Sequence, residues 1–257
     1  MEDRESRIVP PSPLLFAAEM RGLFGVARLF ASAPFLATAP RGDGHAVIVL
    51  PGLYATDRST WAIRGYLKRL GYKATGWGLG RNDRLPGADV PAVAEKIRRL
   101  SEATGARVSL VGWSRGGIIA REASRLAPEA VRLVVTLGSP FAAPAATNVM
   151  SRWRLVSGEQ FLAASPEAVR RLAAPPPAPS TSIYSRADGV CAWRACREIV
   201  GPLSENVEVR GSHIGLGFNA SALWVIADRL AQPLGKWAPF RPSPLLAAFY
   251  PRAEALA

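Results

Sequence analysis

The sequence predicts one α/β domain, built on a mostly parallel sheet of about six strands with helices on both faces. Short apolar runs that suit buried parallel strands alternate with amphipathic helical patterns along the 257 residues. A serine flanked by glycines, Gly112-Trp113-Ser114-Arg115-Gly116, lies between one such run and a helical pattern. The stretch 142–180 interrupts the alternation and ends at a proline-rich segment. We therefore expect a single domain over residues 1–257 with a small lid-like insertion at 142–180.

The expected strands are continuous apolar runs bounded by glycine, proline and polar residues. They cover 45–50, 72–77, 107–111, 131–137, 181–185 and 206–210. The helical patterns between them cover 57–70, 89–104, the stretch after Ser114, and 220–230, with shorter fragments at 150–161 and 166–172 inside the insertion.

The N-terminal region predicts an additional amphipathic helix. Ser12 and Pro13 supply an N-cap and a first helical residue. Apolar residues then recur at helical spacing, at Phe16, Met20, Leu23, Phe24, Ala27 and Phe30. Three charged residues interrupt the stretch, which excludes a membrane span. We expect the apolar stripe to pack on the domain, with peripheral membrane contact as the alternative.

Composition excludes several classes of function. The formal net charge is +12, but 28 of the 32 basic residues are arginines spread singly over the chain. This pattern does not indicate a nucleic-acid surface, so we expect no nucleic-acid partner. The chain starts without the basic region of a signal peptide, which favours a cytoplasmic protein, with peripheral membrane association as the open alternative. Its oligomeric state is left open.

Metal and cofactor sites are not expected. The chain has two cysteines, Cys191 and Cys196, and two histidines, too few for a structural zinc site. On a helix, cysteines five residues apart would point in different directions. A reduced pair is the simplest interpretation, and a disulfide in a loop remains open.

In an open parallel sheet, ligands bind outside the carboxyl ends of the strands. Ser114 follows its strand directly, and a serine hydroxyl needs a base to take its proton. His213 follows the strand at 206–210 and lies on the correct edge, whereas His45 precedes its strand and lies on the opposite edge. We therefore expect His213 to be the base and His45 to be a surface or strand-start residue.

A base of this kind is oriented by a carboxylate. Asp188 follows the strand at 181–185 and again lies on the correct edge. Glu208 lies inside a strand, and Glu198 and Glu205 lie on the approach to it. Asp188 is therefore the preferred acid.

The oxyanion of a tetrahedral intermediate needs amide donors. One is expected to be the backbone N–H of Arg115 at the start of the helix, where the helix dipole helps. The second is expected in the loop after the first strand, at the N–H of Leu53.

From residue 46 to 230 the chain resembles the α/β-hydrolase superfamily, in particular its bacterial esterases and lipases. The resemblance rests on the segments 47–53, 110–117, 136–140, 183–189 and 211–213. It implies Ser114 as nucleophile, Asp188 as acid, His213 as base, and the Leu53 and Arg115 amides as oxyanion hole.

The chain departs from that family in three places. Pro51 stands where many members have a histidine. Arg115 is larger and more polar than the usual residue after the nucleophile, which would favour an anionic acyl group. The first two strands of the full fold are not evident, and an apolar helical pattern replaces them.

The leading hypothesis is a serine hydrolase that cleaves carboxylic esters, as an esterase or lipase acting on a small-molecule or lipid ester. Acyl transfer with the same triad is the first alternative, and a membrane-associated binding protein with little activity is the second. The aromatic and apolar residues expected to contact the substrate are Trp77, Leu79, Trp113, Trp153 and Phe161.

Overall fold

The computed structural model describes residues 8–83, 86–144 and 166–251. Its centre is a six-stranded sheet in which every neighbouring pair is parallel, in the order β2-β1-β3-β4-β5-β6. The strands are β1 (Ala46–Leu50), β2 (Lys73–Gly76), β3 (Val108–Trp113), β4 (Val131–Leu137), β5 (Ser180–Tyr184) and β6 (Ser204–Glu208). The predicted strands are confirmed, with ends displaced by a few residues at most.

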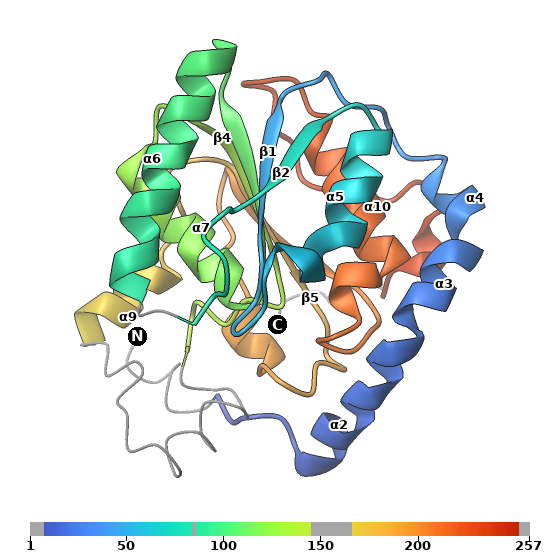
Figure 1. Cartoon of the computed structure of the whole chain (residues 1–257). Helices are drawn as coiled ribbons and strands as arrows, with labels where there is room; N and C mark the ends of the chain where they lie inside the picture. Colours follow the sequence, from blue (N-terminus) through green and yellow to red (C-terminus); the bar gives the residue numbers. More distant parts are fainter. Residues whose placement is uncertain (1–7, 84–85, 145–165, 252–257) are drawn as a thin grey trace.

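Helices cover both faces of the sheet (Figure 1). On one face, Val47 and Val49 of β1 pack in a core with α5 (Trp61–Arg69) and α10 (Ala220–Leu230). On the other face, Ile48 and Leu50 pack with α6 (Pro86–Thr104) and α7 (Arg115–Leu126). The alternation follows from the two-residue period of a strand, which sends successive side chains to opposite faces. The fully apolar sequence of β1 is thereby explained, since both of its faces are buried.

The predicted helix at 57–70 begins differently from the expectation. A 3₁₀ turn, η2 (Asp57–Thr60), precedes α5, and Thr56 caps it by accepting a hydrogen bond from the N–H of Arg58. The carboxylate of Asp57 accepts hydrogen bonds from the N–H groups of Trp77 and Gly78, at 2.9 and 3.1 Å. Asp57 therefore fixes the carboxyl end of β2.

The predicted insertion is described only in part. Its second helical fragment is α9 (Pro166–Ala173), and β5 begins at Ser180. The expected fragment at 150–161 lies outside the described residues. The remaining short elements are the 3₁₀ turns η3 (Trp193–Cys196), η4 (Leu216–Phe218) and η5 (Ala247–Phe249).

The N-terminal segment is helical, as predicted, but it is divided into short elements. These are α2 (Pro13–Ala17), the 3₁₀ helix η1 (Ala18–Phe24), α3 (Gly25–Ala31) and α4 (Ala33–Leu36). The side chain of Ser12 caps α2 by accepting a hydrogen bond from the N–H of Leu15. The segment runs along one side of the molecule beside α5 and α10 (Figure 1).

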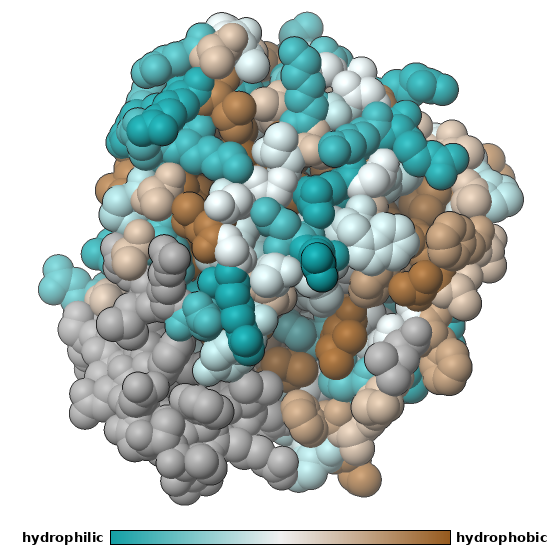
Figure 2. All heavy atoms as spheres, in the orientation of Figure 1, coloured by the Kyte–Doolittle hydropathy of each residue, from teal (hydrophilic) through white to brown (hydrophobic). Residues whose placement is uncertain are grey.

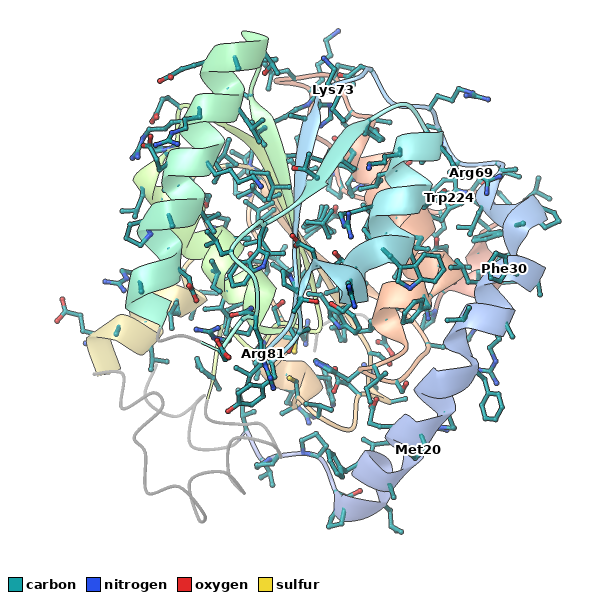
Figure 3. All side chains as sticks on the ribbon, in the orientation of Figure 1. Met20, Phe30, Arg69, Lys73, Arg81 and Trp224 are labelled. Atoms are coloured by element: carbon teal, nitrogen blue, oxygen red, sulfur yellow. The ribbon has the colours of Figure 1, made fainter. Side chains whose placement is uncertain are left out.

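The expectation that the apolar stripe of this segment is covered is wrong. Met20, Phe24 and Phe30 are 64%, 66% and 68% exposed. Figure 2 shows the hydrophobic surface over this part of the molecule, and Figure 3 labels Met20 and Phe30 on its outer side. The inner face of the segment makes contacts through glycines and Glu19, and Leu29, Phe35 and Leu36 pack against the core. No helix among the described residues has both the length and the hydropathy needed to cross a membrane.

Candidate active site

Ser114 lies in a sharp turn between β3 and α7. Its backbone has φ 54° and ψ −124°, in a region that residues other than glycine rarely adopt. Two glycines allow the turn to form. A Cβ atom on Gly112 would lie 2.3 Å from the Cα of Gly117, and one on Gly116 would lie 2.5 Å from the carbonyl oxygen of Leu50. The turn places Ser114 at the carboxyl edge of the sheet, as the sequence pattern predicts.

Asp188 and His213 come from the loops after β5 and β6 and form a buried pair. The Oδ2 atom of Asp188 lies 2.7 Å from Nδ1 of His213. The other oxygen, Oδ1, accepts hydrogen bonds from the N–H groups of Val190 and Cys191, at 2.9 and 2.7 Å. The carboxylate is therefore oriented from both sides, which also sets the orientation of the imidazole ring.

The electrostatic environment of His213 favours its protonated form. Burial by itself lowers the pKa of the imidazole, because it disfavours the charged form. The negative charge of Asp188 and its hydrogen bond act against burial, and the pKa of His213 lies well above its usual value of 6.5. The imidazole is thus suited to accept a proton and to keep it until a leaving group needs it.

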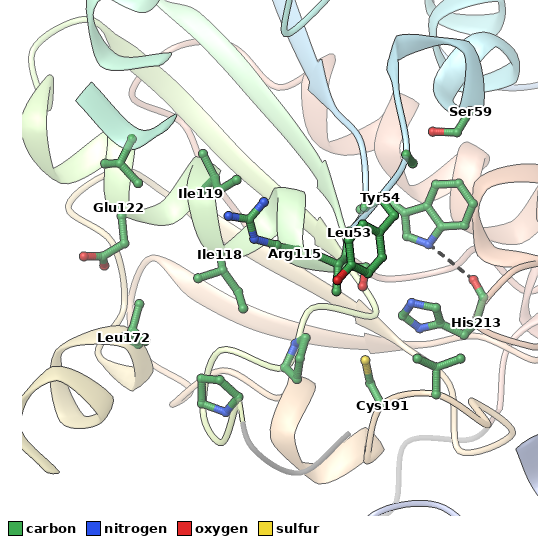
Figure 4. A pocket seen from close by; sticks show the side chains of 18 of the residues that line it. Leu53, Tyr54, Ser59, Arg115, Ile118, Ile119, Glu122, Leu172, Cys191 and His213 are labelled. Carbon is green, nitrogen blue, oxygen red and sulfur yellow. Dashed lines mark hydrogen bonds between the residues drawn. The ribbon is translucent and has the colours of Figure 1, made fainter. Parts of the chain in front are cut away.

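Ser114 and His213 both line one cavity of about 840 Å³ (Figure 4). The cavity extends from His213 past Ser114 and along one face of α7 towards α9. Most of its wall is apolar, and it includes Leu53, Val90, Trp113, Ile118, Ile119, Leu126, Pro140, Leu172 and Ile214. At the far end lies the carboxylate of Glu122, which pairs with Arg125 at 3.0 Å and with Arg171 at 3.1 Å. The cavity suits an apolar ligand.

The two residues expected to supply amide donors lie next to Ser114. Leu53 and Arg115 both line the cavity. Gly52 lies close to Ser114, since a Cβ atom on Gly52 would be 3.3 Å from that of Ser114. Asn82 fixes this loop, because its side-chain NH₂ group donates to the carbonyl oxygen of Pro51 at 2.7 Å and its backbone carbonyl oxygen accepts from the N–H of Tyr54 at 2.8 Å.

The charge of Arg115 is engaged by an acidic neighbour. The guanidinium lies 3.5 Å from the carboxylate of Asp89, which is fully buried. Burial lowers the pKa of Arg115, and the coulombic attraction of Asp89 acts in the opposite direction. This pairing makes Arg115 a weaker attractant for an anionic acyl group than its position in the sequence indicates.

The glutamates that the sequence argument set aside have structural partners. Glu198 pairs with Arg121 of α7, and both side chains are buried. Glu205 accepts hydrogen bonds from Arg229 and from Thr181. Glu208 pairs with Arg186 at 3.1 Å. Each carboxylate is thereby engaged away from His213.

His45 differs in part from its expected position. It precedes β1, on the opposite edge of the sheet from Ser114, but it is buried rather than at the surface. Its ring bonds Asp43 at 2.5 Å and Ser109 at 2.8 Å. Ser109 is fully buried inside β3, so this second group of serine, histidine and aspartate has no access to a substrate.

Of the residues expected to contact the substrate, some line the cavity and others do not. Trp113 lines the cavity, and its ring N–H donates to the carbonyl oxygen of His213 at 3.3 Å. Trp77 does not line the cavity, which corrects the expectation: it is buried between the sheet and α6, and its ring N–H donates to Gly80. Leu79 does not line the cavity either; it is partly buried and packs against the same core. Trp153 and Phe161 lie outside the described residues.

The sequence argument missed three residues at the site. Phe16 and Cys191 line the cavity, and Glu19 accepts hydrogen bonds from the backbone of the two loops that carry Asp188 and His213. The sequence places Phe16 in the N-terminal apolar stripe and gives Glu19 only as one of the three charged residues that interrupt it. Nothing in the spacing of Glu19 indicates a partner 194 residues away.

Cys191 and Cys196 are both buried and free. Cys196 is the last residue of the 3₁₀ turn η3 and Cys191 precedes that turn, so the two do not lie on one α-helix. Burial raises the pKa of Cys191 well above its usual value, so its thiol is neutral at neutral pH. Ligand atoms of Cys191, Asp188 and His213 lie within 4.8 Å of one another. The contact of 2.7 Å between Asp188 and His213 is that of a hydrogen bond, closer than two ligands around one zinc ion lie.

With this geometry in view, the chain can be compared with known proteins. No family model matches it. The polyketide synthase ThaQ of Burkholderia thailandensis is 43% identical over 67 residues, a match that covers 24% of this chain and 3% of that protein. Lipase B of Aspergillus fumigatus is similar in structure, with a TM-score of 0.54 and 16% identity over 76% of this chain and 55% of that one. Lipase BlEst2 of Bacillus licheniformis gives a TM-score of 0.52 and 17% identity over 74% of this chain and 92% of that one.

The chain therefore has the α/β-hydrolase fold. It spans 55% of the fungal lipase chain and a very small part, 3%, of the polyketide synthase. At identities of 16% and 17% the structural similarity establishes the fold, and the function has to be argued from the site.

The raised pKa of His213 predicts a measurable titration. In an NMR titration of the wild-type protein, the His213 ring should lose its proton with a midpoint above 6.5. In Asp188→Asn the charge that raises this pKa is gone while burial remains, so the midpoint should fall below the wild-type value. His45 is the internal control, because it lies on the opposite edge of the sheet. An unchanged His213 midpoint in Asp188→Asn would contradict the coupling.

Proposed function

We propose that this protein hydrolyses carboxylic esters through an acyl-enzyme intermediate formed on Ser114. The observation that carries the proposal is the shared cavity: Ser114 in its strained turn and His213, oriented by Asp188 at 2.7 Å, line the same apolar space. The α/β-hydrolase fold of the chain and its similarity to two lipases agree with this proposal.

In the first half of the reaction, Oγ of Ser114 forms a bond to the carbonyl carbon of the ester while His213 takes the hydroxyl proton. The carbonyl oxygen becomes an oxyanion, which the N–H groups of Leu53 and Arg115 stabilise. When the carbon–oxygen bond to the alcohol breaks, His213 gives the proton to the departing oxygen. Asp188 keeps the imidazole in the required tautomer throughout.

In the second half, water replaces the alcohol. The oxygen of the water molecule forms a bond to the acyl carbon while His213 takes a proton from that water. The same two amides stabilise the second oxyanion. The intermediate then releases the carboxylic acid, and the proton returns from His213 to Ser114. The net reaction converts one ester and one water into one acid and one alcohol.

The cavity wall indicates the kind of acyl group. The wall beyond Ser114 is formed by one apolar face of α7, and the charge of Arg115 is engaged by Asp89. The residues from Ser114 to Leu126 extend about 18 Å along the helix. We therefore propose an apolar acyl group that lies along α7, rather than the anionic acyl group that Arg115 suggests from sequence.

Acyl transfer is the second candidate, because the same residues would serve an alcohol acceptor in place of water. The local similarity to a polyketide synthase, 43% identity over 67 residues, supports acyl transfer as this second candidate. Both candidates require Ser114, and they differ in the fate of the acyl group.

Replacing the proposed nucleophile tests the mechanism. Ser114→Ala should lower kcat for p-nitrophenyl esters on the order of 10⁶-fold, because the acyl-enzyme can no longer form. Ser109→Ala is the matched control: it removes a buried serine of β3, the strand that leads to Ser114, and should retain most of the activity. Wild-type turnover in Ser114→Ala would contradict the proposal. The same reactions, run with added glycerol, separate free acid, the product of hydrolysis, from acyl glycerol, the product of transfer.

We also propose that the N-terminal segment contacts an anionic lipid bilayer. Its exposed apolar residues are Leu14, Met20, Phe24 and Phe30. Exposed Arg21 and Arg28 lie between them, which complements anionic head groups and would repel the same segment of a second copy. Phe16 of this segment lines the cavity, so a bilayer bound here would lie next to the entrance for an apolar ester.

Vesicle binding tests this contact. The wild-type protein should co-sediment with phosphatidylglycerol vesicles more than with phosphatidylcholine vesicles, and binding should weaken as salt is raised. The triple variant Met20→Ser, Phe24→Ser, Phe30→Ser should lose most of this binding and keep its activity on short-chain esters. Equal binding of wild type and triple variant would contradict the contact. A concentration-dependent dimer that the triple variant abolishes would assign the surface to a second copy instead.

A further inference from the structure

One carboxylate of the N-terminal segment is buried against the two loops that carry Asp188 and His213. Glu19 of η1 is 4% exposed. Its Oε1 atom accepts hydrogen bonds from the N–H groups of Gly189 and His213, at 2.7 and 2.8 Å. Its Oε2 atom accepts from the N–H of Ile214 at 2.9 Å. A single side chain thus bonds three backbone amides that are 170 or more residues away in sequence.

These three amides belong to the two loops that carry the acid–base pair. Gly189 directly follows Asp188, and the other two amides are those of His213 itself and of the next residue. The two loops follow different strands, and the pair they carry meets at 2.7 Å. A charged acceptor forms shorter and stronger hydrogen bonds than a neutral one. Glu19 therefore connects the Asp188 loop to the His213 loop beyond the carboxyl ends of the paired strands β5 and β6.

The backbone of the N-terminal segment is closely fitted against the same two loops. A Cβ atom on Gly189 would lie 2.2 Å from the carbonyl oxygen of Leu15. A Cβ atom on Gly22 would lie 2.9 Å from the Cβ of Ile214. Only glycine permits this approach at either position. Contacts from both sides of the interface thus hold Glu19 at a defined distance from the amides.

We infer that Glu19 is a positioning residue for the acid–base pair: through Gly189, His213 and Ile214 it holds the two loops at the separation that lets Asp188 meet His213. The inference rests on the proposed function, since the pair matters for catalysis only if Ser114 is the nucleophile. Glu19 touches neither the substrate nor the reacting atoms. It acts on the rate through the orientation of His213, and displacements of about 1 Å in such groups cost on the order of 10²-fold in rate.

Two variants distinguish positioning from simple support of the fold. Glu19→Ala removes all three hydrogen bonds. Glu19→Gln keeps the shape and one acceptor oxygen, but it turns an NH₂ group towards at least one backbone N–H. Glu95→Gln is the matched control, because Glu95 is an exposed residue of α6 that pairs with Arg99 on the same helix. All are measured at a temperature well below the unfolding midpoint of each variant.

Steady-state kinetics on a p-nitrophenyl ester give the first readout. Glu19→Ala should lower kcat by about 10- to 100-fold with little change in KM, and Glu19→Gln should lie between it and the wild type. Glu95→Gln should match the wild type. A folded Glu19→Ala or Glu19→Gln protein with wild-type kcat would overturn the inference, even if its unfolding temperature were lower. A rise in KM with unchanged kcat would also overturn it, since that pattern indicates weaker substrate binding rather than a misplaced His213.

The second readout does not depend on turnover. The chain has two histidines, so the ring N–H of His213 that bonds Asp188 can be assigned by its loss in His213→Ala. In Glu19→Gln this low-field proton signal should broaden or move towards the position of a histidine without a carboxylate partner. An unchanged signal would overturn positioning by Glu19. If the wild-type protein hydrolyses no ester but the signal responds to Glu19→Gln, the proposed function fails and the positioning of the pair stands.

Discussion

The hydrogen bond between Asp188 and His213 is the contact on which the rest of the site depends. It joins two loops that follow β5 and β6, and both side chains are buried. Burial alone would leave His213 a weak base, since it disfavours the charged imidazolium. The neighbouring carboxylate reverses the sign of this effect and keeps the pKa of His213 high. The backbone contacts of both loops, including those made by Glu19, hold the carboxylate and the ring at hydrogen-bonding distance.

Close packing at the carboxyl edge of the sheet presents Ser114 to the same cavity. The turn at Ser114 requires the chain at residues 112 and 116 to approach neighbouring backbone more closely than any side chain allows. A strained φ at Ser114 persists because β3, the loop after β1 and the start of α7 together over-determine it. The parallel sheet thus brings four separate loop regions to one edge, which is why residues spread over 160 positions form one site.

Much of the fold, and the placement of the candidate site residues on one edge of the sheet, could be predicted because both follow from local rules. Apolar runs such as 46–50 identify buried strands, and the strand-end rule places Ser114, Asp188 and His213 on one edge. Contacts between distant segments could not be predicted. From the sequence, Glu19 is a charge that interrupts an apolar helical pattern, yet its partners are backbone amides of the two loops that carry Asp188 and His213. The sequence places Trp77 at a strand end and predicts that it contacts the substrate, yet the packing of α6 buries it in the core. The sequence predicts that the apolar stripe from Met20 to Phe30 is covered, yet Met20, Phe24 and Phe30 are exposed, because Glu19, the glycines and Leu29 form the inner face here.

The measurement that tests the central claim most directly is labelling with a fluorophosphonate, which reacts with a serine only when a neighbouring base activates it. The account predicts one phosphonyl group per chain, located on Ser114 by peptide mass spectrometry, and a labelling rate that falls when acidification protonates His213. His213→Ala should lose the labelling while its fold is retained. A protein that remains unlabelled at alkaline pH, or that is labelled on another serine, would contradict the claim that Ser114, His213 and Asp188 act together.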